Sequence, residues 1–360
     1  MKKIILGILL LMILLLAACT SESGKGKQPG DTPESNDAGE SESSSEEETA
    51  EDTYANVFPF TGEPTNDPVD HRALAVMVNN HSKARPQTGL SQADIVYELL
   101  AEGEITRFLA VFHSTIPDEV GPVRSARPYY FNLAKAHDAI YTYHGAANFI
   151  DEQIRNDGHD YLNGATYDND GRLFKRDNTR KAPHNSYLLT EGVASVADRK
   201  GYESSRNIAP FTFTNEKTAL NSGGKEVSDL KIIYSERFDS TVSYAYDSKD
   251  GKYMRYSDGK RTEERDDNVP IKLANVLIIE TSHQVIDSAG RRDIDLISGG
   301  KGYLLQAGKL REITWKNESG RIIPYAGDEK AGMLPGRTWV NVIPSSPGLE
   351  QSVSYRVTGE

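Results

Sequence analysis

The chain has 360 residues, a formal net charge of −12 and one cysteine. A single cysteine excludes an internal disulfide or a zinc site built from several thiolates, and the lack of a basic tract argues against nucleic acid as a partner. The charge is uneven: residues 20–56 hold eleven acidic residues and two lysines, a net charge of −9, so the chain beyond them carries only about −5.

The N-terminus predicts export and lipid attachment. Lys2 and Lys3 precede an apolar run at residues 4–16, and Leu-Ala-Ala-Cys ends at Cys19. This order is typical of a secretory signal peptide, and its ending resembles a bacterial lipobox. The resemblance implies cleavage behind Ala18 and a diacylglycerol thioether on Cys19. A transmembrane anchor is the alternative, but it needs roughly 20 apolar residues. We therefore expect a signal peptide at residues 1–18 and a protein anchored to the outer face of the cytoplasmic membrane.

Residues 19–56 are expected to form a disordered acidic tether. They are rich in Ser, Glu, Asp, Gly and Thr, with three consecutive glutamates at residues 46–48. Such a composition cannot bury enough apolar surface to fold. The tether would let an anchored body stand away from the membrane.

Residues 57–209 combine short apolar runs with helical segments. Runs typical of buried strands lie at residues 72–79, 93–98, 106–113 and 139–143, and helices are expected at residues 129–137, 148–155 and 190–199. Strands that alternate with helices indicate an α/β layer. We therefore predict an α/β N-terminal domain over residues 57–209.

From residue 210 the pattern changes to strands separated by glycine-bearing turns. Val242, Tyr244 and Tyr246 alternate along one face, and residues 249–252 turn the chain into a partner strand at residues 253–256. Further strands are expected at residues 275–280, 302–306, 310–315 and 337–343. We predict a mostly β C-terminal domain over residues 210–345 and a C-terminal tail at residues 346–360.

Two arginines three residues apart precede a predicted helix. Arg124 and Arg127 lie in the segment Gly-Pro-Val-Arg-Ser-Ala-Arg-Pro at residues 121–128. Free backbone N–H groups at a helix start, together with two guanidinium groups, would suit one phosphate or carboxylate. Alternatively, the arginines pair with carboxylates such as Asp94 or Glu98.

Further basic residues are expected to join them. Arg180 and His184 lie on a proline-stiffened loop at residues 176–185, and Arg107 and His144 lie at the ends of predicted strands. Loops between regular elements commonly carry binding residues. These residues would line one basic pocket with Arg124 and Arg127, unless the loop is solvated and its charges are unrelated.

One acidic segment invites a test for calcium. Asp168, Asp170 and Asp177 occupy ligand positions of a loop that would begin at Thr166. An EF-hand loop begins with an acidic residue and ends with a bidentate Glu. This segment has neither, and no clear helix precedes it. A plain turn is favoured, and we expect no metal and no cofactor.

Four segments together resemble the YerB-like lipoprotein family of Gram-positive bacteria. They are Arg-Pro-Gln-Thr-Gly-Leu-Ser-Gln-Ala-Asp at residues 85–94, residues 121–128, Ala-Pro-His-Asn at residues 182–185 and Pro-Gly-Arg-Thr-Trp-Val at residues 335–340. The resemblance covers nearly everything after the tether. It implies two consecutive domains behind a lipid anchor, and it implies no activity.

Three functions remain open. The leading hypothesis is a lipoprotein whose first domain binds an anionic wall polymer or lipid-linked precursor. The second is an envelope enzyme acting on a phosphate-bearing or glycopolymer substrate, with Asp94 or Glu98 as the catalytic carboxylate. The third is a protein-interaction scaffold, whose partners the sequence does not identify.

Overall fold

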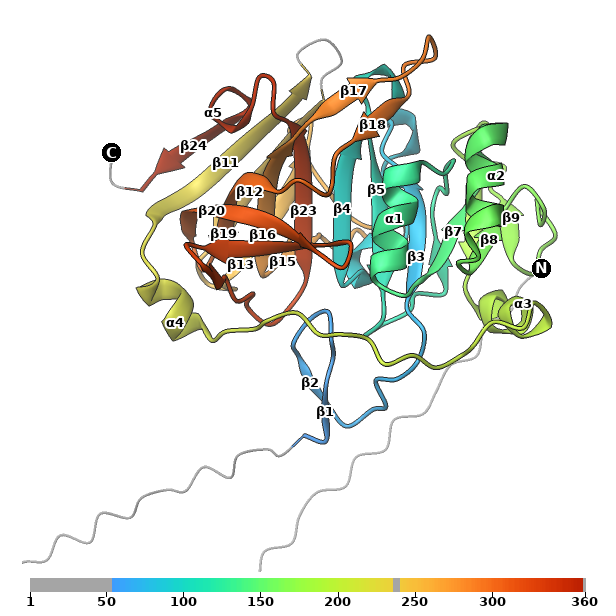
Figure 1. Cartoon of the computed structure of the whole chain (residues 1–360), viewed down its shortest axis with the longest axis horizontal. Coiled ribbons are helices and arrows are strands. Elements are labelled where there is room, and N and C mark those ends of the chain that lie inside the picture. Colours follow the sequence, from blue (N-terminus) through green and yellow to red (C-terminus); the bar gives the residue numbers. More distant parts are fainter. Residues whose placement is uncertain (1–53, 236–239, 359–360) are drawn as a thin grey trace, which may run out of the picture. The chain divides into compact units, whose positions relative to one another are not determined.

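A computed structural model describes residues 54–235 and 240–358. The predicted signal peptide, Cys19 and nearly all of the predicted tether lie outside these residues. Within them, a mixed sheet runs through both predicted parts of the chain (Figure 1). Its strand order is β8–β7–β3–β5–β4–β23–β16–β19–β20–β21–β22.

Strands alternate with helices in the first part, as predicted. Its helix α1 begins with a proline, which suits the first helical position because the missing N–H has no partner there. The elements are β1 (Asn56–Val57), β2 (Pro64–Thr65), β3 (Leu74–Asn79), β4 (Ile95–Leu100), β5 (Thr106–Phe112), β6 (Glu119–Val120), α1 (Pro128–Ala136), β7 (Ile140–Tyr143), α2 (Asn148–Asp157), β8 (Tyr161–Asn163), β9 (Phe174–Arg176), β10 (Ser186–Leu189) and α3 (Glu191–Arg199). Three short 3-10 turns, Ser82–Ala84, Leu90–Gln92 and Glu102–Glu104, lie in the connecting loops.

The second part is mostly strand, which confirms the predicted fold class. The predicted hairpin is formed by β12 and β13, whose register pairs Tyr246 with Tyr253. The elements are α4 (Glu216–Asn221), β11 (Lys225–Ser235), β12 (Ser240–Asp247), β13 (Lys252–Ser257), β14 (Lys260–Arg261), β15 (Lys272–Leu273), β16 (Asn275–Thr281), β17 (His283–Val285), β18 (Arg292–Ile294), β19 (Gly300–Gln306), β20 (Lys309–Glu318), β21 (Arg321–Ala326), β22 (Glu329–Lys330), β23 (Thr338–Pro344), α5 (Leu349–Ser352) and β24 (Val353–Val357).

The residues set apart as a C-terminal tail carry regular structure. They form α5 and β24, and β24 pairs antiparallel with β11. The eleven-residue strand β11 had no counterpart in the sequence prediction. Buried and solvent-facing positions alternate along much of β11, as expected for a strand with one face in solvent. A prediction that relies on runs of apolar residues overlooks this strand, because its polar positions interrupt the run.

The two faces of the mixed sheet have different covers. Val76, Phe108 and Trp339 pack in one cluster with the inward side chains of β11, β12 and β13. Met77 and Leu109 pack on the opposite face with α1. Because both faces are covered, β3, β4 and β5 are buried along their whole length and read as nearly continuous apolar runs.

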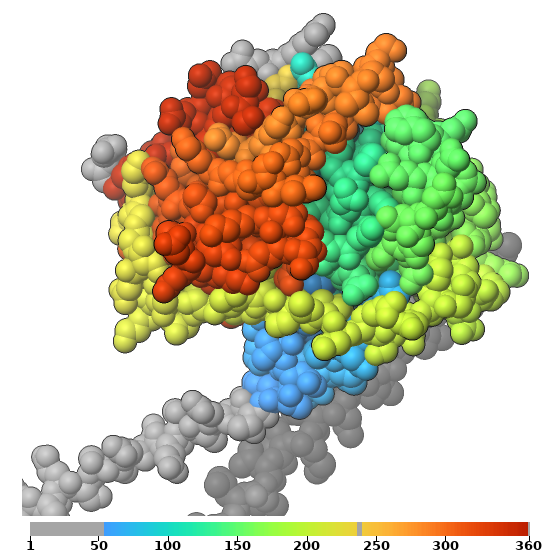
Figure 2. Space-filling model, viewed as in Figure 1, coloured from blue at the N-terminus to red at the C-terminus, as the bar shows by residue number. Residues whose placement is uncertain are grey.

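The segment between α3 and α4 runs along one edge of both parts (Figures 1 and 2). Its backbone is held from both sides. The backbone N–H groups of Phe211 and Thr214 donate to the carbonyls of Pro59 and Met333. The guanidinium group of Arg321 donates a hydrogen bond to the carbonyl of Ala209. This segment therefore packs as an ordered strap.

One buried ion pair joins the two parts. Glu98 on β4 and Arg255 on β13 meet at 2.8 Å, and both side chains are completely buried. Trp339 donates its indole N–H to the same carboxylate oxygen at 2.9 Å, and Thr106 donates its hydroxyl to the other oxygen at 2.8 Å. The Arg255 guanidinium lies over the Trp339 ring, 4.3 Å from its centroid. The carboxylate thus has partners for both oxygens, as a buried charge requires.

A second carboxylate, Asp94, is buried just before β4. Its oxygens accept the N–H of Ser114 at 2.8 Å and the hydroxyl of the same residue. Burial raises the pKa of Asp94 to about 6, although the Ser114 hydrogen bonds act in the opposite direction. The folded protein therefore holds an Asp94 proton more tightly than an exposed aspartate would.

We expect Arg255→Ala to lower the free energy of unfolding by about 3–5 kcal/mol, because it leaves Glu98 as an unpaired buried charge. Urea denaturation measures this change. Arg261→Ala is the matched control, since its pair with Glu263 is partly exposed and costs less than about 1 kcal/mol when lost. Equal losses in the two variants would contradict a stabilising role for the buried pair.

The raised pKa of Asp94 predicts a pH dependence of stability. An unfolded aspartate titrates near pH ~3.9, so the free energy of unfolding should fall by about 2–3 kcal/mol as the pH rises from about 4 to about 6. Asp94→Asn should remove this part of the slope in urea titrations. Asp118→Asn, at an exposed position, should keep it. An unchanged slope in Asp94→Asn would refute the assignment.

Candidate functional site

Three of the motif segments meet at one end of the sheet. The loop after β3 bonds to the loop before α1 through two backbone hydrogen bonds between Thr88 and Gly121, at 2.9 and 3.1 Å. That second loop bonds to β10 through Val123 N–H and Ser186 O at 2.6 Å. The loop between β9 and β10 reaches the first through Arg180, which donates to the carbonyls of Ala84 and Pro86 at 2.6 Å each. Cis peptide bonds precede Pro86, Pro122 and Pro183 in these loops.

Two of the predicted arginines share one carboxylate. Arg107 binds one oxygen of Glu102 at 2.9 Å, and Arg127 forms a close ion pair with the other. Arg107 also donates to the carbonyl of Ser125 at 3.0 Å. Burial, and then the charge of Arg127, lower the pKa of Arg107 to about 10. Burial raises the pKa of Glu102, but Arg107 and Arg127 outweigh it and hold that pKa below the ordinary value.

Arg124 differs from these two arginines. Its backbone is fixed by hydrogen bonds to Met77 and His144, and its side chain is half-buried. Among residues 54–235 and 240–358, no carboxylate and no hydrogen-bond acceptor engages its guanidinium. Burial and the charge of Arg127 lower its pKa. Arg124 in turn contributes to the lowered pKa values of three histidines, which burial lowers first: His81, His144 and His184.

The histidines around Arg124 are held in defined positions. The His184 ring lies 4.7 Å from the His81 ring, and its Nδ1 lies 2.9 Å from the amide nitrogen of Asn79. The Nε2 of His144 lies 3.1 Å from Arg176, which can only donate. His144 therefore accepts at Nε2 and donates from Nδ1 to the Ser186 hydroxyl at 2.7 Å.

The six predicted ligand residues thus divide into groups. Arg107 and Arg127 are buried and bound to Glu102, and Arg180 binds two backbone carbonyls. Arg124 lies near His144 and His184 with a free guanidinium. Sequence reasoning missed two members of this region, His81 and Glu102, and it included Arg176 only as the first residue of the loop at residues 176–185. The position of His81 and Glu102 could have identified them, because both follow the carboxyl ends of predicted strands.

The two candidate catalytic carboxylates lie elsewhere. Glu98 binds Arg255 inside the core. Asp94 precedes β4, whereas Glu102 follows it, and six residues of strand separate the two ends by roughly 20 Å. Neither carboxylate pairs with Arg124 or Arg127, the alternative that the sequence left open.

The three calcium candidates each have another partner. Asp168 pairs with Arg176 at 2.7 Å, and Asp177 forms a close pair with Arg265. Asp170 accepts the backbone N–H groups of residues 172–174. In the described part of the chain, no group of three or more His, Cys, Asp or Glu side chains is arranged to hold a metal ion.

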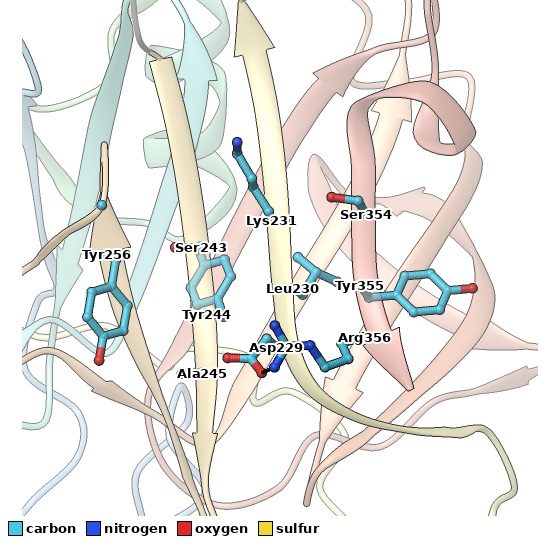
Figure 3. Close-up of a pocket in the computed structure, with 11 residues that line it drawn as sticks. Asp229, Leu230, Lys231, Ser243, Tyr244, Ala245, Tyr256, Ser354, Tyr355 and Arg356 are labelled. Carbon is cyan, nitrogen blue, oxygen red and sulfur yellow. Dashed lines mark ion pairs between the residues drawn. The ribbon is translucent and has the colours of Figure 1, made fainter. Parts of the chain in front are cut away.

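An open trough of about 470 Å³ lies on the solvent face of β24, β11, β12 and β13 (Figure 3). Asp229 and Arg356 point toward one another across β11 and β24 at 3.7 Å, and Tyr256 lies on the opposite side. The arginine of this trough therefore has a carboxylate partner, in contrast to Arg124.

Comparison with known proteins places the chain in a family. Residues 60–203 match "Protein of unknown function (DUF3048) N-terminal domain", and residues 230–340 match the corresponding C-terminal domain. "Putative lipoprotein YerB" of Bacillus subtilis (strain 168) is 43% identical over 288 residues, which cover 79% of this chain and 86% of that protein. The crystal structure of the YerB protein from Bacillus subtilis matches with a TM-score of 0.76 and 41% identity, and covers 84% of this chain and 99% of that one.

These relatives agree with the resemblance drawn from the sequence motifs. Neither the family descriptions nor the name of the relative assigns a ligand or a reaction. Within the described residues, no helix has the length and apolar character needed to cross a membrane. The chain belongs to the DUF3048 family, that of the YerB-like lipoproteins.

Proposed function

We propose that this protein binds an anionic group of a cell-envelope molecule through Arg124, while lipid on Cys19 anchors it to the outer face of the cytoplasmic membrane. The observation that carries the proposal is the free guanidinium of Arg124. Its two arginine neighbours share a carboxylate, whereas Arg124 has none among the described residues.

The local charge favours an anion. Arg107, Arg124 and Arg127 contribute three positive charges, and Glu102 offsets one of them. Burial and then repulsion between the cations lower the pKa of Arg124 and the nearby histidines, and a bound anion would offset the repulsion. Phosphate and carboxylate suit a guanidinium best, because each offers two oxygens to its planar pair of N–H groups.

The position of Arg124 in the fold also suits a binding site. Its neighbours His81 and His144 follow the carboxyl ends of β3 and β7, which run parallel in the sheet. Ligands of sheets with parallel strands commonly bind outside these ends, where the loops diverge. The loops here carry the motif segments, and their mutual hydrogen bonds hold the basic side chains in place.

The proposed anchor rests on the sequence and on a relative. The Leu-Ala-Ala-Cys ending supplies the cysteine that lipid attachment needs, and the relative from Bacillus subtilis carries the name "Putative lipoprotein YerB". A two-chain lipid gives the stable attachment that a single acyl chain does not.

We expect Cys19→Ala to move the protein from the membrane fraction to the soluble or secreted fraction. Cell fractionation followed by detection of the protein in each fraction measures this change. The wild-type protein, washed with high salt, is the control for electrostatic adsorption. Retention of Cys19→Ala in salt-washed membranes would exclude lipid as the anchor.

We expect Arg124→Gln to weaken pyrophosphate binding at least about tenfold, the size of effect expected for a lost charge-assisted hydrogen bond. Isothermal titration calorimetry on the purified protein measures the dissociation constant. The free energy of unfolding of Arg124→Gln should stay within about 0.5 kcal/mol of the wild-type value, because the substitution removes no hydrogen bond or ion pair within the described residues. Arg127→Gln is unsuitable as a test because it would leave Glu102 with one partner.

Arg356→Gln is the matched control, since its side chain is 77% exposed. It should bind pyrophosphate like the wild-type protein. Wild-type protein that binds neither phosphate nor pyrophosphate, or an Arg124→Gln variant that binds as tightly as wild type, would overturn the proposed anion site.

A further inference from the structure

A separate cavity lies beside the loop at residues 82–87. Its volume is about 300 Å³, at the lower end of the range for small-ligand sites. One wall is this loop, which includes the first residues of the Arg-Pro-Gln-Thr-Gly motif. The other wall is formed by residues 257–263, where β13 turns into β14. None of the residues around Arg124 that form the proposed anion site lines this cavity.

Gln87 lines the cavity, and its amide oxygen has no hydrogen-bond partner among the described residues. Gln87 is 2% exposed, and its amide nitrogen donates to the carbonyl of Asn79 at 3.0 Å and to the side-chain oxygen of Asn80 at 3.3 Å. Both amide hydrogens are therefore used, which fixes the orientation of the side chain. In the described residues the Gln87 side-chain oxygen accepts no hydrogen bond, so it is available to a hydroxyl group.

The floor of the cavity presents hydroxyl donors. Ser257 and Thr262 each accept a hydrogen bond from Arg255 at 2.7 Å. Their own hydrogens therefore point elsewhere, and the two oxygens lie 3.5 Å apart. One hydroxyl can donate to the other, which leaves at least one O–H hydrogen free for a ligand oxygen.

The charges at the rim leave one cation free. Arg85 pairs with Asp258 at 2.5 Å, and Arg261 pairs with Glu263 at 3.0 Å. Both carboxylates are thus engaged by guanidinium groups. Lys260 also lines the cavity, and its ammonium has no partner among the described residues.

We propose that this cavity binds a small polyhydroxylated acid, such as a sugar acid of one ring. Lys260 holds the acidic group, Gln87 accepts a ligand hydroxyl, and the Ser257–Thr262 pair donates to a ligand oxygen. A ligand with several hydroxyl groups can donate to the acceptor and accept from the donor on the cavity walls. A ligand with one negative charge matches the single unpaired cation, Lys260. This site is additional to the anion site at Arg124.

Calorimetric titration of the full-length protein with glucuronate, glucose and acetate tests the proposal. We expect glucuronate to bind saturably and more tightly than either glucose or acetate, because only glucuronate carries both hydroxyls and a carboxylate. Lys260→Gln should weaken glucuronate binding about fivefold, the effect of losing one partly exposed charge pair, and should leave glucose binding unchanged. Ser82→Trp, at an exposed position on the cavity wall, should block glucuronate by filling the space.

Two control variants separate this site from others. Lys249→Gln removes an exposed lysine from the turn between β12 and β13, outside the cavity, and should bind glucuronate like wild type. Arg124→Gln should do the same, which distinguishes this site from the anion site. Absence of saturable glucuronate binding, equal binding of acetate, or unchanged binding in both Lys260→Gln and Ser82→Trp would overturn the proposal.

Discussion

A carboxylate and a guanidinium withdrawn completely from water determine how the two parts of this protein meet. Glu98 and Arg255 are fully buried and 157 residues apart. Removing two charges from water costs several kcal/mol for each ion, and only close geometry and additional hydrogen bonds offset that cost. Trp339 and Thr106 supply those bonds. A displacement of β13 over β4 would separate Arg255 from both Glu98 and Trp339, so the ion pair selects one register between the layers.

The same polar network extends to the loops that carry both proposed sites. Asn80 donates to Thr106 and Glu98, and its side-chain oxygen accepts from Arg85 and Gln87. On the other side, Arg255 bonds to the hydroxyls on the cavity floor. The loop at residues 82–87 is therefore positioned from the core, from β13 and β14, and from Arg180 on the third loop. These bonds hold the loop in position, because they connect it to residues of the sheets and of a neighbouring loop.

Arginine has three different roles in this fold. Arg255 is a buried structural cation, Arg107 and Arg127 hold a carboxylate at the edge of the sheet, and Arg180 fixes backbone carbonyls. Arg124 has no comparable partner in the described residues. In a protein with a net charge of −12, a cation that remains unpaired beside two others marks a local positive potential rather than an average property of the surface.

Much of the fold could be predicted from the sequence because its signals are local. The apolar run at β3, the proline at the start of α1 and the alternation along β12 depend on residues close together in the chain. The solvent-facing strand β11 was missed although its buried and solvent-facing positions alternate as in β12, because its polar positions leave no run of apolar residues. Strand β24 was missed because it lies beyond the last clear apolar segment. It is held by pairing with β11, where Leu230 lies opposite Tyr355, 125 residues later in the chain.

The candidate site was only partly predictable. Residue type and loop position were enough to select Arg107, Arg124, Arg127, His144, Arg180 and His184 as basic candidates. Which arginine keeps a free guanidinium depends on where Glu102 and the carbonyls of Ala84 and Pro86 come to lie. The sequence by itself indicated most of the strands and helices, the mostly β character of the second part, and the family. Only the tertiary structure decided the ion-pair partners, because Coulomb and hydrogen-bond energies depend on distances between residues that are far apart in the chain.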